Sequence, residues 1–154
     1  MSPGMILPTW VANNKVMTGE IHRIAIFEDN AVDRFIYERT LEHLPFGYDA
    51  RIFQTPDEGL HNAHYLEFDV IIIHVNFWGT NYGFQILSEM KKICRNNPVF
   101  LATSSYLHED ELNHILAKGF TNAYEKPVIF SRFEDILSQF TEKETTASRH
   151  GFSF

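Results

Sequence analysis

Apolar runs of strand length alternate along this chain with longer segments that carry one apolar face. The runs that predict β-strands are residues 23–27, 50–53, 70–75, 99–102 and 123–125. The third run is continuously apolar from Val70 to Ile73. Such a run is typical of a parallel strand that helices cover on both faces.

Helical periodicity fills the segments between these runs. In the last segment, Phe133, Ile136, Leu137 and Phe140 follow the spacing of one helical face. A hydroxyl residue followed three positions later by glutamate predicts a helix start at Thr55 and again at Ser131. The other predicted helices cover residues 30–43, 82–95 and 108–118, the last with Gly119 as its stop.

Five strand and helix pairs in alternation predict an α/β fold, with a doubly wound, five-stranded parallel sheet flanked by helices. Ligands of such sheets bind outside the carboxyl ends of the strands, where the strand order reverses. We expect one domain over residues 21–140. Residues 1–20 are interpreted as an N-terminal extension and residues 141–154 as a polar C-terminal tail, because neither has a sustained apolar face.

Composition and charge limit the classes of function that this chain can have. A chain of 154 residues with 44% hydrophobic residues can bury one substantial core. The net charge of −7, with no run of Lys or Arg, argues against nucleic acid as a partner. Cys94 is the only cysteine, which excludes an intrachain disulfide and fits a reducing compartment. Residues 1–20 match neither a signal peptide nor a membrane span, so we expect a cytoplasmic protein without membrane contact.

Polar side chains stand at the carboxyl ends of four predicted strands. Because these ends meet at one edge of a parallel sheet, we expect the side chains to converge. They are Glu28 and Asp29 after the first strand, His74 in the third, Thr103 and Ser104 after the fourth, and Lys126 after the fifth.

This set resembles, in order and spacing, the receiver domain of bacterial two-component response regulators. The matching motifs are Phe27-Glu28-Asp29-Asn30, Asp69-Val-Ile-Ile-Ile-His74, Pro98-Val-Phe-Leu-Ala-Thr103 and Gly119-Phe-Thr-Asn-Ala-Tyr-Glu-Lys126-Pro127. The resemblance covers residues 21–140 and implies a flavodoxin-like, receiver-type fold.

The resemblance implies a role for each matching residue. Glu28, Asp29 and the backbone carbonyl of Asn76 match the family's Mg²⁺ ligands. Thr103 and Lys126 match the hydroxyl and ammonium groups that contact the phosphoryl oxygens. These roles are physically sound, because Mg²⁺ prefers hard oxygen ligands and a phosphoryl group needs its charge compensated.

The chain also departs from the family at three places. His74 stands where the family has its phosphoacceptor aspartate, which removes a carboxylate and weakens the expected Mg²⁺ site. The loop of residues 77–83 is one residue longer than usual and carries Trp78 where proline is common. Ala123 replaces the aromatic residue at the family's switch position, three residues before Lys126.

Three interpretations of His74 follow. The imidazole can have a structural and electrostatic role, in which its protonated form compensates Glu28 and Asp29 and holds one conformation. It can join the two carboxylates in a site for a transition metal, since this ligand set suits Zn²⁺ or Fe²⁺. It can also be a phosphohistidine nucleophile.

Simpler alternatives apply to the other polar residues. Glu28 and Asp29 can serve only to cap the helix that follows them. Thr103 and Ser104 can begin a loop. Lys126 can be a solvated lysine in a turn.

The sequence therefore predicts an atypical single-domain receiver of a phosphorelay that is not an enzyme and acts through phosphorylation-independent protein contacts. The alternative is a metal-binding or phosphohistidine-forming derivative that uses His74. We expect no output domain after these residues, and therefore docking to a sensor kinase, to another regulator or to a second copy as a homodimer. The candidate interface consists of Tyr106, Leu107, Tyr124 and the exposed sides of residues 108–118 and 131–140.

Overall fold

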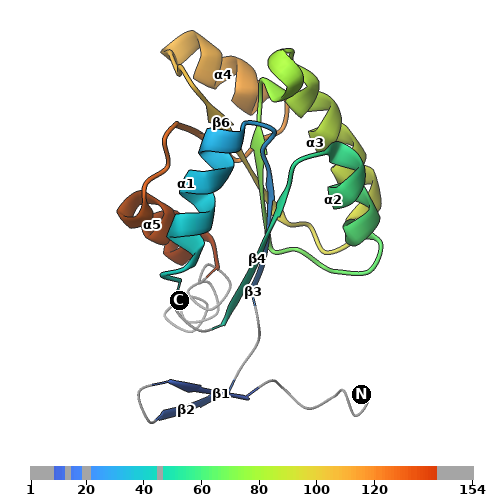
Figure 1. Ribbon diagram of the computed structural model, residues 1–154. Coiled ribbons are helices and arrows are strands. Elements are labelled where there is room, and N and C mark those ends of the chain that lie inside the picture. Colours follow the sequence, from blue (N-terminus) through green and yellow to red (C-terminus); the bar gives the residue numbers. More distant parts are fainter. Residues whose placement is uncertain (1–8, 13–14, 19–21, 45–46, 142–154) are drawn as a thin grey trace, which may run out of the picture.

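The protein is described by a computed structural model that covers residues 9–12, 15–18, 22–44 and 47–141. Its main sheet has five parallel strands in the order β4-β3-β5-β6-β7 (Figure 1). The strands are β3 (His22–Phe27), β4 (Tyr48–Phe53), β5 (Val70–His74), β6 (Val99–Ser104) and β7 (Asn122–Glu125). The predicted doubly wound sheet is confirmed, with its strand order reversing between β3 and β5.

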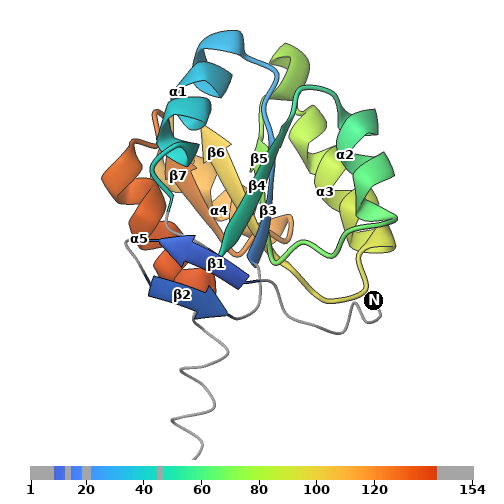
Figure 2. The same ribbon diagram turned by 60° about the horizontal axis from the view of Figure 1, so that its bottom comes forward.

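Helices cover both faces of this sheet. One face packs against α1 (Ala31–Leu41) and α5 (Phe130–Thr141), and the other against α2 (Pro56–Ala63), α3 (Tyr82–Ile93) and α4 (Glu109–Ala117) (Figures 1 and 2). The two cores divide each strand by alternation. On β3, Ile24 and Ile26 face the core with Tyr37, whereas Ala25 and Phe27 face the opposite core.

The central strand β5 is buried along its whole length, from Val70 to His74. Both its neighbours in the sheet and the helices on both faces exclude water from it, which accounts for its continuous apolar run. The only polar side chain of this strand is therefore delivered to its carboxyl end, at the point where the strand order reverses.

Local sequence signals fix several element boundaries. Thr55 forms the predicted capping box with Glu58 at the start of α2, and Gly119 has the left-handed φ of +117° expected of a helix stop. The predicted start at Ser131 is wrong. The amide of Phe133 donates to the carbonyl of Ile129, so α5 begins earlier and Ser131 lies within its first turn.

A second, smaller sheet lies outside the main one. It consists of β1 (Thr9–Ala12) and β2 (Lys15–Thr18), which pair antiparallel from Thr9 with Thr18 to Ala12 with Lys15. These two strands, within residues 1–20, were not predicted from the sequence. Residues 142–154 of the expected C-terminal tail lie outside the described residues. In the described part of the chain, no helix has the length and apolar character needed to cross a membrane.

Candidate functional site

His74 lies at the end of β5, beside Thr103 of β6, with only 10% of its side chain exposed. Its Nδ1 is 2.9 Å from Oε2 of Glu28 and 3.3 Å from Oδ1 of Asp29. A ring nitrogen that faces two carboxylate oxygens is a donor, so these partners assign a proton to Nδ1. The imidazole thus bridges the two acidic residues that follow β3.

Lys126 comes to the same point from the end of β7. Its Nζ donates to Oε1 of Glu28 at 3.0 Å and to Oδ2 of Asp33 at 2.5 Å, and it lies 3.5 Å from Nδ1 of His74. The side chain is 7% exposed, so the interpretation as a solvated turn lysine is wrong. The peptide bond between Lys126 and Pro127 is cis.

The two acidic residues are bound to protein groups at both carboxylate oxygens. Glu28 is fully buried, and its Oε2 accepts the amide N–H of Asn30 at 3.1 Å in addition to the imidazole contact. Asp29 accepts the amide N–H of Trp78 at 2.8 Å through Oδ2. The helix cap is Asn30 instead, whose Oδ1 accepts the amide of Asp33 at 3.0 Å. The interpretation of Glu28 and Asp29 as mere caps is therefore wrong.

Charge explains why these groups gather. A buried carboxylate is tolerated when opposite charges and hydrogen bonds replace its lost hydration. Here three carboxylates, those of Glu28, Asp29 and Asp33, gather around His74 and the ammonium of Lys126. The net charge of the group is −2 with a neutral imidazole and −1 with a protonated one. We refer to these four side chains, together with that of His74, as the acidic cluster.

Thr103 and Tyr37 place two hydroxyls beside the acidic cluster. Both hydroxyls are buried and, among the described residues, neither meets the geometry of a hydrogen bond. Burial and the nearby charges of Glu28 and Asp33 raise the pKa of Tyr37, while the neighbouring Thr103 hydroxyl lowers it less strongly. Thr103 thus lies inside β6 and faces the site, contrary to its interpretation as the start of a loop.

Ser104 does not join the site. Its Oγ donates to the carbonyl of Tyr106 at 3.0 Å and accepts the amide of the same residue at 3.4 Å. The hydroxyl therefore closes the turn after β6, as local hydroxyl bonds often do.

The loop after β5 begins with Asn76 and contains a short 3₁₀ turn, η1 (Phe77–Gly79). The carbonyl of Asn76 accepts the amide of Gly79 at 2.9 Å, so the expected metal ligand already has a partner in the loop. Trp78 has a φ of +59°, which is uncommon for a bulky residue. The hydrogen bond from the backbone N–H of Trp78 to Oδ2 of Asp29 holds this conformation, while the indole packs on Tyr82 with 4.8 Å between ring centroids.

Ala123 lies in β7 opposite Ala102, and both side chains are buried. The next residue, Tyr124, points to the other face of the sheet, where only 8% of it is exposed and Arg132 lies over its ring. Tyr124 is therefore wrong as a member of an exposed interface, because strand alternation buries it under α5. Tyr106 is 67% exposed, as an interface residue requires, and Leu107 is partly buried.

The metal-ligand atoms of the acidic cluster decide which cation it could bind. Glu28, Asp29 and His74 offer ligand atoms that lie within 4.8 Å of one another. Mg²⁺ demands octahedral oxygen coordination, and an imidazole N–H between two carboxylates does not fit it. A nitrogen and two oxygens suit Zn²⁺ or Fe²⁺, provided that Nδ1 loses its proton.

Sequence reasoning missed three side chains that build the site, namely those of Asp33, Arg34 and Tyr37. Arg34 donates to the carbonyl of Asp29 at 2.7 Å and to that of Glu28 at 3.3 Å, which fixes the loop after β3. Asp33 and Tyr37 follow Asp29 at intervals of four residues. This spacing places them on one face of a helix and could have revealed both.

Comparison with solved structures finds many response regulator receiver domains with this fold. A response regulator from Burkholderia pseudomallei has 20% identity and a TM-score of 0.62, covering 86% of this chain and 74% of its own. A receiver domain of a DNA-binding response regulator from Colwellia psychrerythraea has 24% identity and a TM-score of 0.66, with coverages of 79% and 98%. A CheY-like receiver domain from Methanospirillum hungatei has 23% identity and a TM-score of 0.65, with coverages of 82% and 99%.

No protein-family model and no curated protein sequence matches this chain. At the identities given above, the likeness to solved structures is a likeness of fold. The chain thus has the receiver-type, flavodoxin-like fold, with β4-β3-β5-β6-β7 as its strand order.

Proposed function

We propose that this chain is an atypical receiver of two-component signalling that acts through protein contacts independent of phosphorylation. The observation that carries the proposal is the position of His74. Its imidazole lies at 2.9 and 3.3 Å from the carboxylates of Glu28 and Asp29, at the end of the central strand.

The family that this chain resembles accepts the phosphoryl group on an aspartate. The structural neighbour from Burkholderia pseudomallei contains a phosphorylated aspartic acid and a calcium ion. In this chain no acidic residue lies in β5, and an imidazole cannot form an acyl phosphate. Lys126, the expected phosphoryl contact, is already paired with Glu28 and Asp33.

The acidic cluster supports a single conformation of the domain. His74 and Lys126 bind the carboxylate oxygens of Glu28 that a bound cation would otherwise coordinate. Ala123 offers no aromatic side chain that could move in response to the site. A receiver without an acceptor and without this readout would present a fixed surface to its partner.

The same geometry disfavours a phosphohistidine formed through Nδ1 of His74. Nδ1 faces two carboxylates, so a phosphoryl donor approaching that atom would bring further negative charge against them. Nucleophilic attack through Nδ1 would also break both contacts.

The remaining features of the proposal concern organisation and partners. Residues 21–140 form the receiver unit, residues 1–20 an extension and residues 141–154 a tail. The partner is a sensor kinase, another regulator or a second copy of the chain, and the module is not an enzyme. The net charge of −7 supports a protein partner rather than nucleic acid.

A transition-metal site is the second candidate function, because Glu28, Asp29 and His74 can offer three ligand atoms to one ion. This candidate predicts that the purified protein retains Zn²⁺ or Fe²⁺ through dialysis and that His74→Ala loses it. Protein without bound metal under these conditions would reject the candidate.

Acetyl phosphate with Mg²⁺ tests the main proposal. We expect no gain of phosphoryl mass in the wild-type protein, and a phosphoryl group on residue 74 in His74→Asp. The matched control is His74→Asn, which has the size of aspartate without its charge and should stay unmodified. A stable phosphoryl group on the wild-type protein would contradict the proposal.

A further inference from the structure

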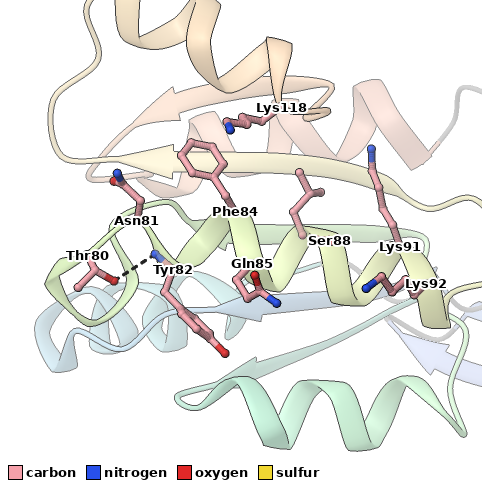
Figure 3. Close-up of a pocket in the computed structure, with 10 residues that line it drawn as sticks. Thr80, Asn81, Tyr82, Phe84, Gln85, Ser88, Lys91, Lys92 and Lys118 are labelled. Carbon is pink, nitrogen blue, oxygen red and sulfur yellow. Dashed lines mark hydrogen bonds between the residues drawn. The ribbon is translucent and has the colours of Figure 1, made fainter.

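A groove with a volume of about 970 Å³ lies between α3 and the end of α4 (Figure 3). Phe84 and Lys118 lie next to each other at one side of it, and Asn81 and Lys91 mark its two ends along α3. The acidic cluster lies elsewhere, at the carboxyl ends of the strands, so this groove is a separate feature of the molecule.

The charge of the groove is opposite to that of the chain. Its lining includes the ammonium groups of Lys91, Lys92 and Lys118 and no acidic residue. The whole chain has twenty acidic and thirteen basic residues. The net charge of −7 repels anionic ligands from most of the protein surface. A local group of positive charges therefore attracts them to the groove in particular.

The walls of the groove are held in place by contacts within the protein. Nζ of Lys118 lies 5.6 Å from the centroid of the Phe84 ring, which also packs against His114 and Phe120. Nζ of Lys91 donates to the carbonyl of Gly119 at 3.1 Å. Because these side chains are already ordered, a ligand would lose little affinity to ordering them.

The shape and polar groups of the groove fit an extended peptide. The lining follows α3 from Asn81 to Lys92, a length of roughly 16 Å at about 1.5 Å per residue. This length matches about five residues of extended chain. Asn81, whose side chain does not cap α3, places an amide group along the groove that can bind peptide backbone. The amide nitrogen of Gln85 donates to Glu89 at 3.2 Å, so Gln85 offers its carbonyl oxygen as an acceptor.

A nucleotide fits the same groove less well. Lys118 covers the Phe84 ring, which removes a stacking surface for a base. Tyr82 stacks on Trp78, and its ring points away from Phe84 and Lys118 (Figure 3). No glycine-rich phosphate loop lines the groove.

We infer that this groove binds an acidic, extended segment of a partner protein. The inference rests on the proposed function as a docking module and adds the chemistry of the partner. Carboxylates of the segment would pair with Lys92 and Lys118, while its backbone would bind the amides along α3.

Fluorescence anisotropy of a labelled hexaglutamate peptide at low ionic strength tests the inference. We expect salt-sensitive binding to the wild-type protein, weakened about threefold by Lys92→Gln or Lys118→Gln alone and about tenfold by both. Arg39→Gln is the matched control, because it removes the same charge from α1, on the opposite face of the sheet, and should leave the affinity unchanged.

Each other outcome overturns the inference. If the peptide does not bind in a salt-sensitive way, the inference is wrong. If Arg39→Gln lowers the peptide affinity as much as the lysine variants do, the binding is non-specific. ATP that binds more tightly than the peptide through the same lysines would assign the groove to nucleotides. His74→Asp should keep the peptide affinity, so a failure of the proposed function at the acidic cluster is distinguishable from a failure at the groove.

Discussion

Substitution of Lys126 by methionine probes the acidic cluster most directly. The change keeps an unbranched side chain that is one atom shorter and removes the ammonium that binds Glu28 and Asp33. Glu28 is fully buried, so water cannot replace the lost partner without a rearrangement of the domain. We therefore expect a large loss of stability without a change of fold.

The magnitude follows from what remains bound to Glu28. Breaking a buried ion pair by removing one partner costs roughly 3–5 kcal/mol. Glu28 keeps its contacts with the imidazole of His74 and the amide of Asn30, which favours a loss near the lower limit, about 3 kcal/mol. For a chain of 154 residues, a loss of this size lowers the Tm by roughly 6 to 12 °C.

Urea denaturation followed by far-ultraviolet circular dichroism measures the change, with Arg39→Met as the control. Arg39 pairs with Glu42 at the surface, so its replacement should alter the free energy of unfolding by less than about 0.5 kcal/mol. In the double variant Glu28→Gln/Lys126→Met, the loss should be smaller than the sum of the two single losses, because no carboxylate remains at position 28.

The reasoning is refuted if Lys126→Met costs no more than Arg39→Met. That result would mean that the carboxylates of Glu28 and Asp33 do not depend on the ammonium. Additive losses in the double variant would likewise show that Glu28 and Lys126 are not energetically coupled.

Three further substitutions test other contacts. Tyr37→Phe removes a buried hydroxyl without a hydrogen bond and should leave the stability unchanged or raise it by up to about 1 kcal/mol in urea denaturation. Because the folded pKa of Tyr37 is raised above the ordinary 10.0, the wild-type protein should lose stability as pH rises beyond about 10, and less so in Tyr37→Phe. Gly83→Ala would place a Cβ 2.5 Å from the carbonyl oxygen of His74 and should cost more than about 1 kcal/mol. Asn30→Ala removes the cap of α1 and should cost about 1 kcal/mol by the same measurement.

The sequence was sufficient to predict the fold because its local and global signals agree. The apolar run from Val70 to Ile73 permits burial on both faces, and Thr55 and Gly119 mark helix ends by backbone chemistry. The predicted helix start at Ser131 was wrong because the packing of the helix, and not the capping pattern, decides where the helix begins. With the apolar face that includes Phe133 packed on the sheet, α5 begins at Phe130, two residues before the first helical position that the pattern predicts.

The candidate site was predictable only in part, because pairing across the sheet has no local signature. The positions of Glu28, Asp29, His74 and Lys126 at the ends of the predicted strands indicated that they would meet. They did not indicate that Lys126 would also pair with Asp33. Tyr124 illustrates the same limit. The sequence of a four-residue strand does not indicate on which face of the sheet its aromatic side chain will lie.

The substitution at position 74 changes what the site needs from outside the protein. With aspartate there, four carboxylates would face Lys126 alone, a net charge of −3, and a divalent cation would be required to offset it. With histidine the net charge is −2 or −1, and the imidazole N–H binds two of the carboxylates directly. The His74→Asp variant should therefore become less stable without Mg²⁺ and regain stability with it, whereas the wild-type protein should respond to Mg²⁺ weakly. A wild-type Tm that rises with Mg²⁺ as much as that of His74→Asp would show that histidine does not take over the role of the cation.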